Sequence, residues 1–158
     1  MRSILRVNWD SNLPIYNISQ SELKKKGINS LLLDVDGTLV NRKSNMIPKA
    51  VKNWIIESKE LFSLYLISNN PSKKRIAKIA KELNLRYKYN ASKPRKGVTL
   101  SAIKEIGREP KNIAIIGDRI FTDIIVGKLK DKGAILVEDD EFDKIQPLIE
   151  TELEKSSS

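Results

Sequence analysis

The sequence predicts an α/β fold, in which a doubly wound parallel sheet of about five strands carries helices on both faces. Two observations predict it. Short apolar runs alternate along the chain with segments of helical periodicity. The runs are also continuously apolar, as is typical of strands that are buried on both faces of a parallel sheet.

The first expected elements are a short helix and a strand. Ser19 and Glu22 have the spacing of a capping box, and Gly27 is placed to end the helix that follows. The apolar segment 30–35 then predicts the first buried strand.

A helix, a strand and a second helix are expected next. Pro48 suits the first turn of a helix that extends to about Lys59 and turns Trp54 toward the core. Segment 61–67 predicts the second buried strand. The spacing of apolar residues then predicts a helix over 72–83 with one apolar and one basic face.

The remaining elements continue the alternation. A weak strand is expected at 86–89, a helix near 95–106 that Gly107 ends, and a strand at 112–117 as apolar as the first. The last expected elements are a helix near 122–130, a strand near 134–138 and an acidic helix from about Phe142. We expect one domain over 1–153 and a disordered tail over 154–158.

The 158 residues include no cysteine and no histidine. Their absence excludes disulfides, the usual structural zinc sites and catalysis by Ser-His-Asp or Cys-His, so a bound metal has to be a hard cation held by oxygens. No apolar stretch approaches the roughly 18 residues that span a bilayer, and the amino terminus lacks a signal-peptide core. We therefore expect a cytoplasmic protein with no transmembrane segment, able to lie at the periphery of a membrane.

The net charge of +9 arises in one segment. Residues 71–111 hold thirteen Lys and Arg against three Glu, and the rest of the chain is nearly balanced. Such a segment would attract phosphate esters, an anionic membrane surface or nucleic acid. The alternative is that these lysines only cover solvated helix faces.

Polar residues follow four of the expected strands. Because ligands of doubly wound folds bind beyond the carboxyl ends of the strands, these residues are the candidates for a site. They are Asp34, Asp36, Gly37 and Thr38; Ser68, Asn69 and Asn70; Lys93; and Asp118, Arg119 and Asp123.

The acidic residues of this set predict a Mg²⁺-type cation. Asp34 and Asp36 end a buried strand two residues apart, where their repulsion is tolerable mainly with a cation between them. Asp118 can supply a third oxygen ligand from a neighbouring strand.

The other residues of the set predict a phosphate beside that cation. Lys93 and the Ser68 hydroxyl could hold its oxygens, and the turn at Gly37 and Thr38 could offer backbone N–H groups. The implied chemistry is phosphoryl transfer to a carboxylate nucleophile.

The same residues resemble four motifs of the haloacid dehalogenase (HAD) superfamily of aspartate-nucleophile phosphatases. The motifs are DVDGTL at 34–39, SNN at 68–70, KP at 93–94 and GDRIFTD at 117–123, and they occur in the order of the family. The resemblance implies a Rossmann-like fold. The segments between the motifs are too short for a cap domain, so we expect a capless member with an open site for bulky substrates.

A narrower resemblance is to the YqeG-type branch, similar to phosphatidylglycerophosphate phosphatases. It rests on the leader at 13–18, SNN, ASKP at 91–94 and GDRIFTDI at 117–124. The chain departs from that branch at two places. Gly37 stands where the branch often has Asn, and GKLK at 127–130 stands where the branch has a G-N-R segment.

The family resemblance implies a role for each candidate. Asp34 would attack phosphorus to form an aspartyl phosphate, and Asp36 would protonate the leaving group and then take a proton from the hydrolytic water. Mg²⁺ would be the cofactor, with Asp34, Asp36, Asp118 and Asp123 as its expected ligands. The expected phosphate-binding residues are Gly37, Thr38, Ser68, Asn69 and Lys93.

Several of these residues have a structural alternative. Thr38 could only cap its turn, Ser68 could be a helix N-cap, and Asn69 or Asn70 could serve the turn before a proline. Arg95 or Lys96 could replace Lys93. Asp123 could be placed at a helix start by the helix dipole alone.

The leading function is a Mg²⁺-dependent phosphomonoesterase that acts on a lipid phosphate such as phosphatidylglycerophosphate. The first alternative is a phosphatase of nucleic-acid ends or of soluble phosphorylated metabolites. Nucleic acid is less favoured because no aromatic stacking platform accompanies the basic segment. The second alternative is a non-catalytic phosphate-binding module.

Overall fold

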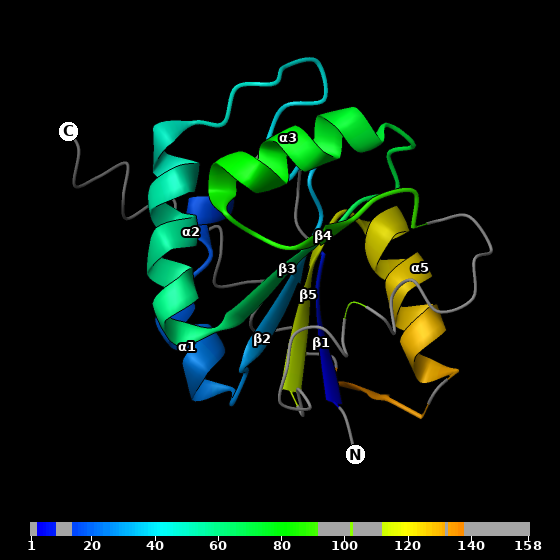
Figure 1. Ribbon diagram of the computed structural model, residues 1–158. Coiled ribbons are helices and arrows are strands. Elements are labelled where there is room, and N and C mark those ends of the chain that lie inside the picture. Colours follow the sequence, from blue (N-terminus) through cyan, green and yellow to red (C-terminus); the bar gives the residue numbers. More distant parts are fainter. Residues whose placement is uncertain (1–2, 9–13, 92–101, 103–111, 132, 138–158) are drawn as a thin grey trace.

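The computed structural model describes residues 3–8, 14–91, 102, 112–131 and 133–137. Six parallel strands form one sheet in the order β4-β3-β2-β5-β1-β6 (Figure 1). They are β1 (Ser3–Asn8), β2 (Ser30–Leu33), β3 (Ser63–Ile67), β4 (Tyr87–Lys88), β5 (Asn112–Gly117) and β6 (Ile135–Val137).

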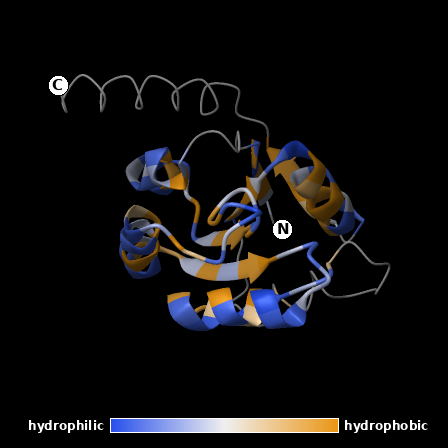
Figure 2. Cartoon of the chain, turned by 90° about the horizontal axis from the view of Figure 1, so that it is seen from above, coloured by the Kyte–Doolittle hydropathy of each residue, from blue (hydrophilic) through white to orange (hydrophobic). Residues whose placement is uncertain are grey.

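The helices lie on both sides of this sheet, so the predicted α/β, doubly wound, Rossmann-like class is confirmed. They are the short 3-10 helix η1 (Ile15–Asn17), α1 (Gln20–Lys25), α2 (Lys49–Leu61), α3 (Lys73–Leu83) and α5 (Arg119–Lys130). Figure 2 shows the hydrophobic colour concentrated on the strands and on the inner sides of the helices.

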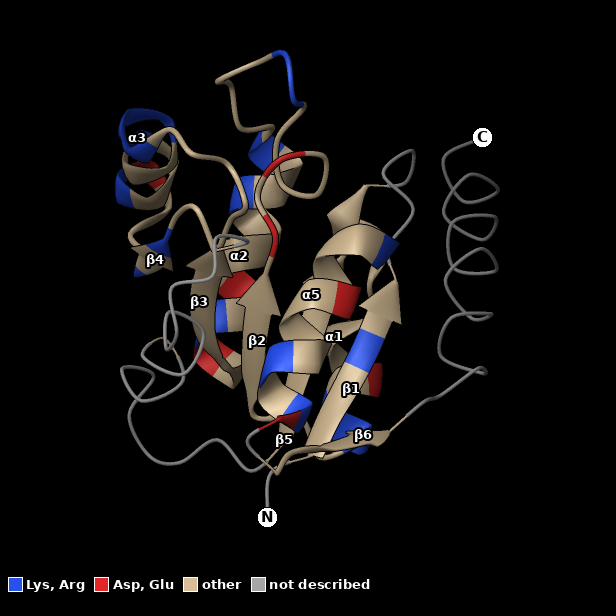
Figure 3. Cartoon of the chain, turned by 90° about the vertical axis from the view of Figure 1, so that its right-hand side faces the viewer, with Lys and Arg blue, Asp and Glu red and all other residues tan. Residues whose placement is uncertain are grey.

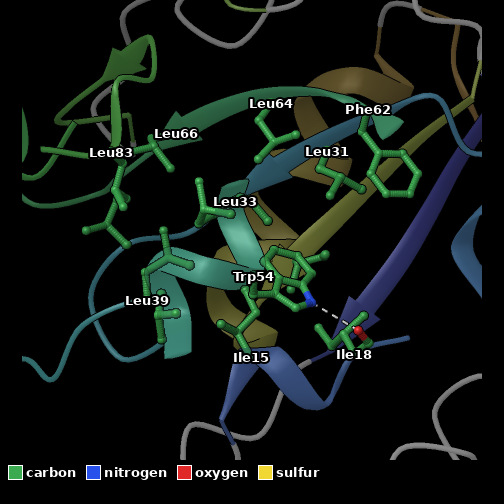
Figure 4. Packing of buried hydrophobic residues seen from close by; sticks show 14 of the residues in the cluster. Ile15, Ile18, Leu31, Leu33, Leu39, Trp54, Phe62, Leu64, Leu66 and Leu83 are labelled. Atoms are coloured by element: carbon green, nitrogen blue, oxygen red, sulfur yellow. Dashed lines mark hydrogen bonds between the residues drawn. The ribbon is translucent and has the colours of Figure 1, made fainter. Parts of the chain in front are cut away.

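One face of the sheet packs against α1, α2 and α3. Leu31 and Leu33 of β2 point to this face, where they belong to the same buried cluster as Trp54 of α2 (Figure 4). The indole Nε1 of Trp54 donates a hydrogen bond to the carbonyl of Ile18 at 3.1 Å, so the polar atom of this core residue is satisfied.

The other face packs against α5. Leu32 of β2 points to this side and joins the buried cluster of Phe121 and Ile125. The alternation of Leu31, Leu32 and Leu33 between the two clusters follows from the two-residue period of a strand, which explains why the whole apolar run is buried.

Most predicted elements are confirmed within one to three residues. The Ser19 hydroxyl accepts from the backbone N–H of Glu22 at the start of α1, and Gly27 follows that helix with φ +78°. Apart from Ala102, the expected helix near 95–106 lies outside the described residues, as do the helix from Phe142 and the tail 154–158.

The strand that the sequence reasoning missed is β1, which raises the number of strands from the predicted five to six. Ile4, Leu5 and Val7 are buried, but Arg6 interrupts the apolar run. β1 lies between β5 and β6 and is parallel to both.

The start of α5 lies three residues before the predicted one. The helix begins at Arg119 rather than near Thr122, because Asp118 is its N-cap and accepts from the backbone N–H of Phe121 at 2.8 Å.

The chain runs from β2 outward to β3 and β4, then returns to the other side of β2 to form β5. The order therefore reverses between β2 and β5, and doubly wound sheets bind ligands outside the carboxyl ends of the strands at such a point. Within the described residues, no helix is long and apolar enough to cross a membrane.

Candidate active site

A cleft of about 370 Å³ lies beyond the carboxyl ends of β2, β3 and β5. Its lining contains six of the candidate residues, which come from three separate loops: Asp34, Asp36, Ser68, Asn69, Asn70 and Asp118. Figure 3 shows the acidic colour directly beyond the arrowhead of β2, and the basic colour gathered on α3 nearby.

Asp34 is the most deeply placed acid of the cleft. Only 6% of it is exposed, and its Oδ1 accepts from the backbone N–H of Val35 at 2.8 Å. The pKa of Asp34 is raised to about 8, mainly by burial. The charges of Asp118 and Asp36 act in the same direction, whereas the hydrogen bond from Val35 and the charge of Arg42 oppose the shift. A nearby cation would therefore favour the ionised form that a nucleophile needs.

Asp36 is held through both of its carboxylate oxygens. Oδ2 accepts from Nδ2 of Asn70 at 2.9 Å, and Oδ1 accepts from Arg75 through Nη2 at 2.6 Å and Nε at 3.0 Å. Nη2 of Arg75 also donates to the carbonyl of Asn41 at 3.2 Å, and Nη1 to the side chain of Asn45. Arg75 thus ties α3 to Asp36 and to the loop after it.

Asp118 uses its two oxygens differently. Oδ1 caps α5, whereas Oδ2 accepts from Nη2 of Arg42 at 3.1 Å. Arg42 and Arg75 were both missed as site residues. Each is one basic residue among many in the sequence, and their roles depend on the path of the loop after β2.

The turn after β2 uses its own backbone donors. Gly37 has φ +80° and donates its N–H to the carbonyl of Val40 at 2.8 Å, while Thr38 donates to Val35 at 3.2 Å. The two N–H groups expected to bind phosphate are therefore engaged inside the turn. The predicted role of Gly37 and Thr38 in phosphate binding stays a prediction.

Ser68 lies at the end of β3 and is 1% exposed. Its hydroxyl accepts from the backbone N–H of Asn70 at 3.0 Å, so it stabilises the turn. The alternative of Ser68 as a helix N-cap is wrong, because Ser72 caps α3 by accepting from the N–H of Arg75.

The two asparagines after Ser68 differ. Oδ1 of Asn70 accepts from the N–H of Ser72 at 2.8 Å, which confirms the turn role considered for it. Oδ1 of Asn69 is buried and has no hydrogen-bond partner within the described part of the chain. An unpartnered buried oxygen in the wall of a cleft is a candidate to bind a ligand.

Asp123 is a predicted site residue that the structure does not bring to the cleft. Asp123 lies in the second turn of α5, where it pairs with Nη1 of Arg6 of β1 at 3.0 Å and does not line the cleft. Its alternative as a residue of the helix start is also wrong, since α5 begins at Arg119. Lys93 and its possible substitutes Arg95 and Lys96 lie outside the described residues.

The oxygen donors of the cleft suit a hard cation. Among the described residues no group of three or more Asp, Glu, His or Cys could hold an ion. Asp36 is already bound to Arg75. Asp34 and Asp118 remain, with the unpartnered amide oxygen of Asn69 beside them. Two carboxylates fit Mg²⁺, which keeps several waters and takes further oxygens from a substrate phosphate.

A second groove, of about 530 Å³, borders the cleft and shares Arg42 with it. Its lining combines basic and apolar side chains, among them Lys43, Tyr16, Pro14 and Pro48. Tyr16 is 42% exposed. The groove is therefore suited to a molecule with both anionic and apolar parts.

Comparison with known proteins gives two matches. A family model described as mitochondrial PGP phosphatase matches residues 3–140. The protein called probable phosphatase YqeG of Bacillus subtilis (strain 168) is 27% identical over 124 residues, which cover 78% of this chain and 72% of that protein. No solved structure matches the chain.

Proposed function

This chain belongs to the PGP phosphatase family, and from that membership we propose that it is a Mg²⁺-dependent phosphomonoester hydrolase of the HAD type. It acts through an aspartyl-phosphate intermediate. Its substrate is a lipid phosphate such as phosphatidylglycerophosphate.

The observation that carries the proposal is the meeting of Asp34 and Asp118 beyond β2 and β5. Both line one cleft, and the charge of Asp118 contributes to the raised pKa of Asp34. With no cysteine or histidine in the chain, a carboxylate is the group best suited to attack phosphorus.

Asp34 is the nucleophile. The hydrogen bond from Val35 occupies Oδ1, which leaves Oδ2 to attack the phosphorus in line with the leaving oxygen. Bound at Asp34 and Asp118, Mg²⁺ would neutralise charge on the phosphoryl group and lower the pKa of the nucleophile. The new bond joins Asp34 to phosphorus, and the bond to the leaving oxygen breaks.

Asp36 supplies the proton for the leaving oxygen and later accepts one from water. Its Oδ1 is held by the guanidinium of Arg75, while Oδ2 is held only by the neutral amide of Asn70. Oδ2 is therefore the oxygen suited to carry the proton, and Asn70 has to release it during turnover.

Three features support a lipid phosphate as substrate. The groove beside the cleft combines apolar and basic side chains. The loop after β2 and α2 fills the chain between Asp36 and β3, so no cap covers the cleft within the described residues. The outer face of α3 exposes Lys74, Lys78 and Lys81.

The test is hydrolysis of a panel that contains phosphatidylglycerophosphate, a nucleic-acid 5′-phosphate, glycerol phosphate and p-nitrophenyl phosphate, with Mg²⁺ or with a chelator. We expect turnover only with Mg²⁺, fastest on the lipid, and none by Asp34→Asn. Activity above a few per cent in Asp34→Asn would contradict the assignment of Asp34 as the nucleophile. Preference for a soluble phosphate would contradict the lipid substrate alone.

A further inference from the structure

Arg42 is paired with Asp118, one of the two carboxylates of the proposed cation site. Its Nη2 donates to Oδ2 of Asp118 at 3.1 Å, and the other oxygen of that carboxylate already caps α5. The guanidinium therefore binds Oδ2, the oxygen of Asp118 that does not cap the helix. Arg42 also lies close enough to Asp34 for its charge to act on that residue.

The guanidinium of Arg42 lies close over Gly37. A Cβ atom built on Gly37 would lie 3.3 Å from Nε of Arg42, which is closer than an ordinary van der Waals contact. The absence of a side chain at 37 lets the guanidinium lie over the turn.

The contact between Arg42 and Asp118 is also easily broken. The side chain of Arg42 is 65% exposed, and that of Asp118 is 35% exposed. Exposed ion pairs of this kind are weak, and a divalent ion interacts with a carboxylate more strongly than a singly charged guanidinium does.

We propose that Arg42 is a tethered cation that neutralises Asp118 in the metal-free protein and competes with the divalent ion for that carboxylate. With the ion held at Asp118, Arg42 would be released from that carboxylate. Arg42 thereby sets the concentration of Mg²⁺ at which the site fills. The inference rests on the proposed function, because that proposal identifies the ion as Mg²⁺.

The experiment measures Mg²⁺ binding by isothermal titration calorimetry, in the absence of substrate, for the full chain. We expect the dissociation constant of Arg42→Gln to be about two- to fivefold lower than that of the unmodified protein, as the loss of a weak competing ion pair requires. Lys43→Gln is the matched control. It removes the same charge one residue away, and Lys43 forms no ion pair in the described part of the chain.

A second variant tests the same contact from its other side. Asn tolerates a positive φ, so Gly37→Asn can keep the turn while its side chain displaces Arg42. We expect Gly37→Asn also to bind Mg²⁺ more tightly, and to have no further effect when combined with Arg42→Gln.

The outcomes separate the inference from the proposed function. Equal Mg²⁺ affinity in Arg42→Gln and the unmodified protein, or an equal gain in Lys43→Gln, would overturn the competition and leave the phosphatase proposal standing. Absence of Mg²⁺ binding in every variant, together with hydrolysis that a chelator does not affect, would overturn both.

Discussion

The guanidinium of Arg75 holds Asp36 by donating two hydrogen bonds to one carboxylate oxygen, from Nη2 at 2.6 Å and from Nε at 3.0 Å. Both side chains are largely buried, with 16% and 10% of their surfaces exposed. The pair fixes the residue proposed to carry the proton, and it does so from a helix that lies outside the motif of Asp36.

We therefore expect Arg75→Ala to lower the free energy of unfolding by about 3 kcal/mol, because Asp36 would stay buried without its partner. Turnover should fall with it. Arg75→Lys keeps the charge but loses the paired N–H donors of the guanidinium. It should therefore recover part of the stability and part of the turnover that Arg75→Ala loses. Urea denaturation and kcat measure the two effects, and an unchanged kcat in Arg75→Ala would show that Asp36 needs no such support.

The raised pKa of Asp34 predicts a pH dependence of stability. The folded protein holds a proton on Asp34 up to about pH 8, whereas the unfolded chain loses it near 3.8. Between these values the free energy of unfolding of the metal-free protein should therefore fall as pH rises, by about 1.4 kcal/mol per pH unit from this group.

Asp34→Asn should remove that slope. Denaturation with a chelator at pH 5, 6.5 and 8 compares the two proteins. The same slope in Asp34→Asn would mean that other groups cause it. Mg²⁺ should reduce the slope of the unmodified protein, since a cation favours the ionised carboxylate.

Two substitutions of Asp118 separate its structural and metal-binding roles. Asn is as good an N-cap as Asp, so Asp118→Asn should keep the stability of the metal-free protein, whereas Asp118→Ala should lose about 1 kcal/mol. Both should raise the Mg²⁺ concentration for half-maximal activity, on the order of tenfold or more. If Asp118→Asn needed no more Mg²⁺ than the unmodified protein, Asp118 would act only as a cap.

Gly117 and Gly127 offer a matched pair of substitutions. A Cβ on Gly117 would overlap the ring of Phe121 and lie 2.9 Å from Cβ of Asp34, whereas one on Gly127 would meet nothing within 4 Å. Gly117→Ala should cost about 1 to 3 kcal/mol and displace Asp34, with a loss of activity. Gly127→Ala in the exposed helix interior should stabilise by about 1 kcal/mol with activity intact. Thermal unfolding measures the stability of each variant, and kcat measures its activity. Full activity in Gly117→Ala would show that the end of β5 can shift to accept the methyl group without displacing Asp34.

The exposed face of α3 is the expected site of contact with an anionic membrane surface. Lys74, Lys78 and Lys81 are exposed while Ile76 and Ile79 are buried, as the predicted amphipathic helix requires. Near an anionic membrane each such lysine should contribute about 1 kcal/mol, less with added salt.

We expect sedimentation with acidic but not neutral vesicles, and reversal of these three charges should abolish it. The same reversal of Lys24, Lys25 and Lys26, at the end of α1, is the control for net charge. In Figure 1, α1 lies at the lower end of the molecule and α3 at the upper end. Equal loss in the control would mean that only total charge matters. Absence of binding to either vesicle type would mean that the lysines of the basic segment only cover a solvated surface.

The sequence predicted the residues that topology alone brings together. Asp34, Ser68 and Asp118 each follow an apolar run, and parallel strands place such positions at one edge of the sheet. Their neighbours were harder to predict. Arg42 reaches Asp118 from the loop after β2, and Arg75 reaches Asp36 from α3 while it also donates to the carbonyl of Asn41 in that loop. No local sequence pattern reports the course of the loop.

The same limit explains Asp123 and β1. Asp123 was expected beside the cation, but Arg6 holds it, and Arg6 comes from the strand that the sequence did not reveal. Arg6, which interrupts the apolar run of β1, is thus the partner of Asp123, the predicted metal ligand that does not reach the cleft.

The place of β1 in the sheet has a consequence for the order of folding. Ser3 of β1 pairs with Asn112 of β5, 109 residues later, and β6 follows β5 in the chain. On the ribosome, β1 emerges before either partner exists, and pairings of such long separation form slowly. Until β5 is made, Ile4, Leu5 and Val7 are exposed on the nascent chain, where they are the apolar surface that a chaperone would bind.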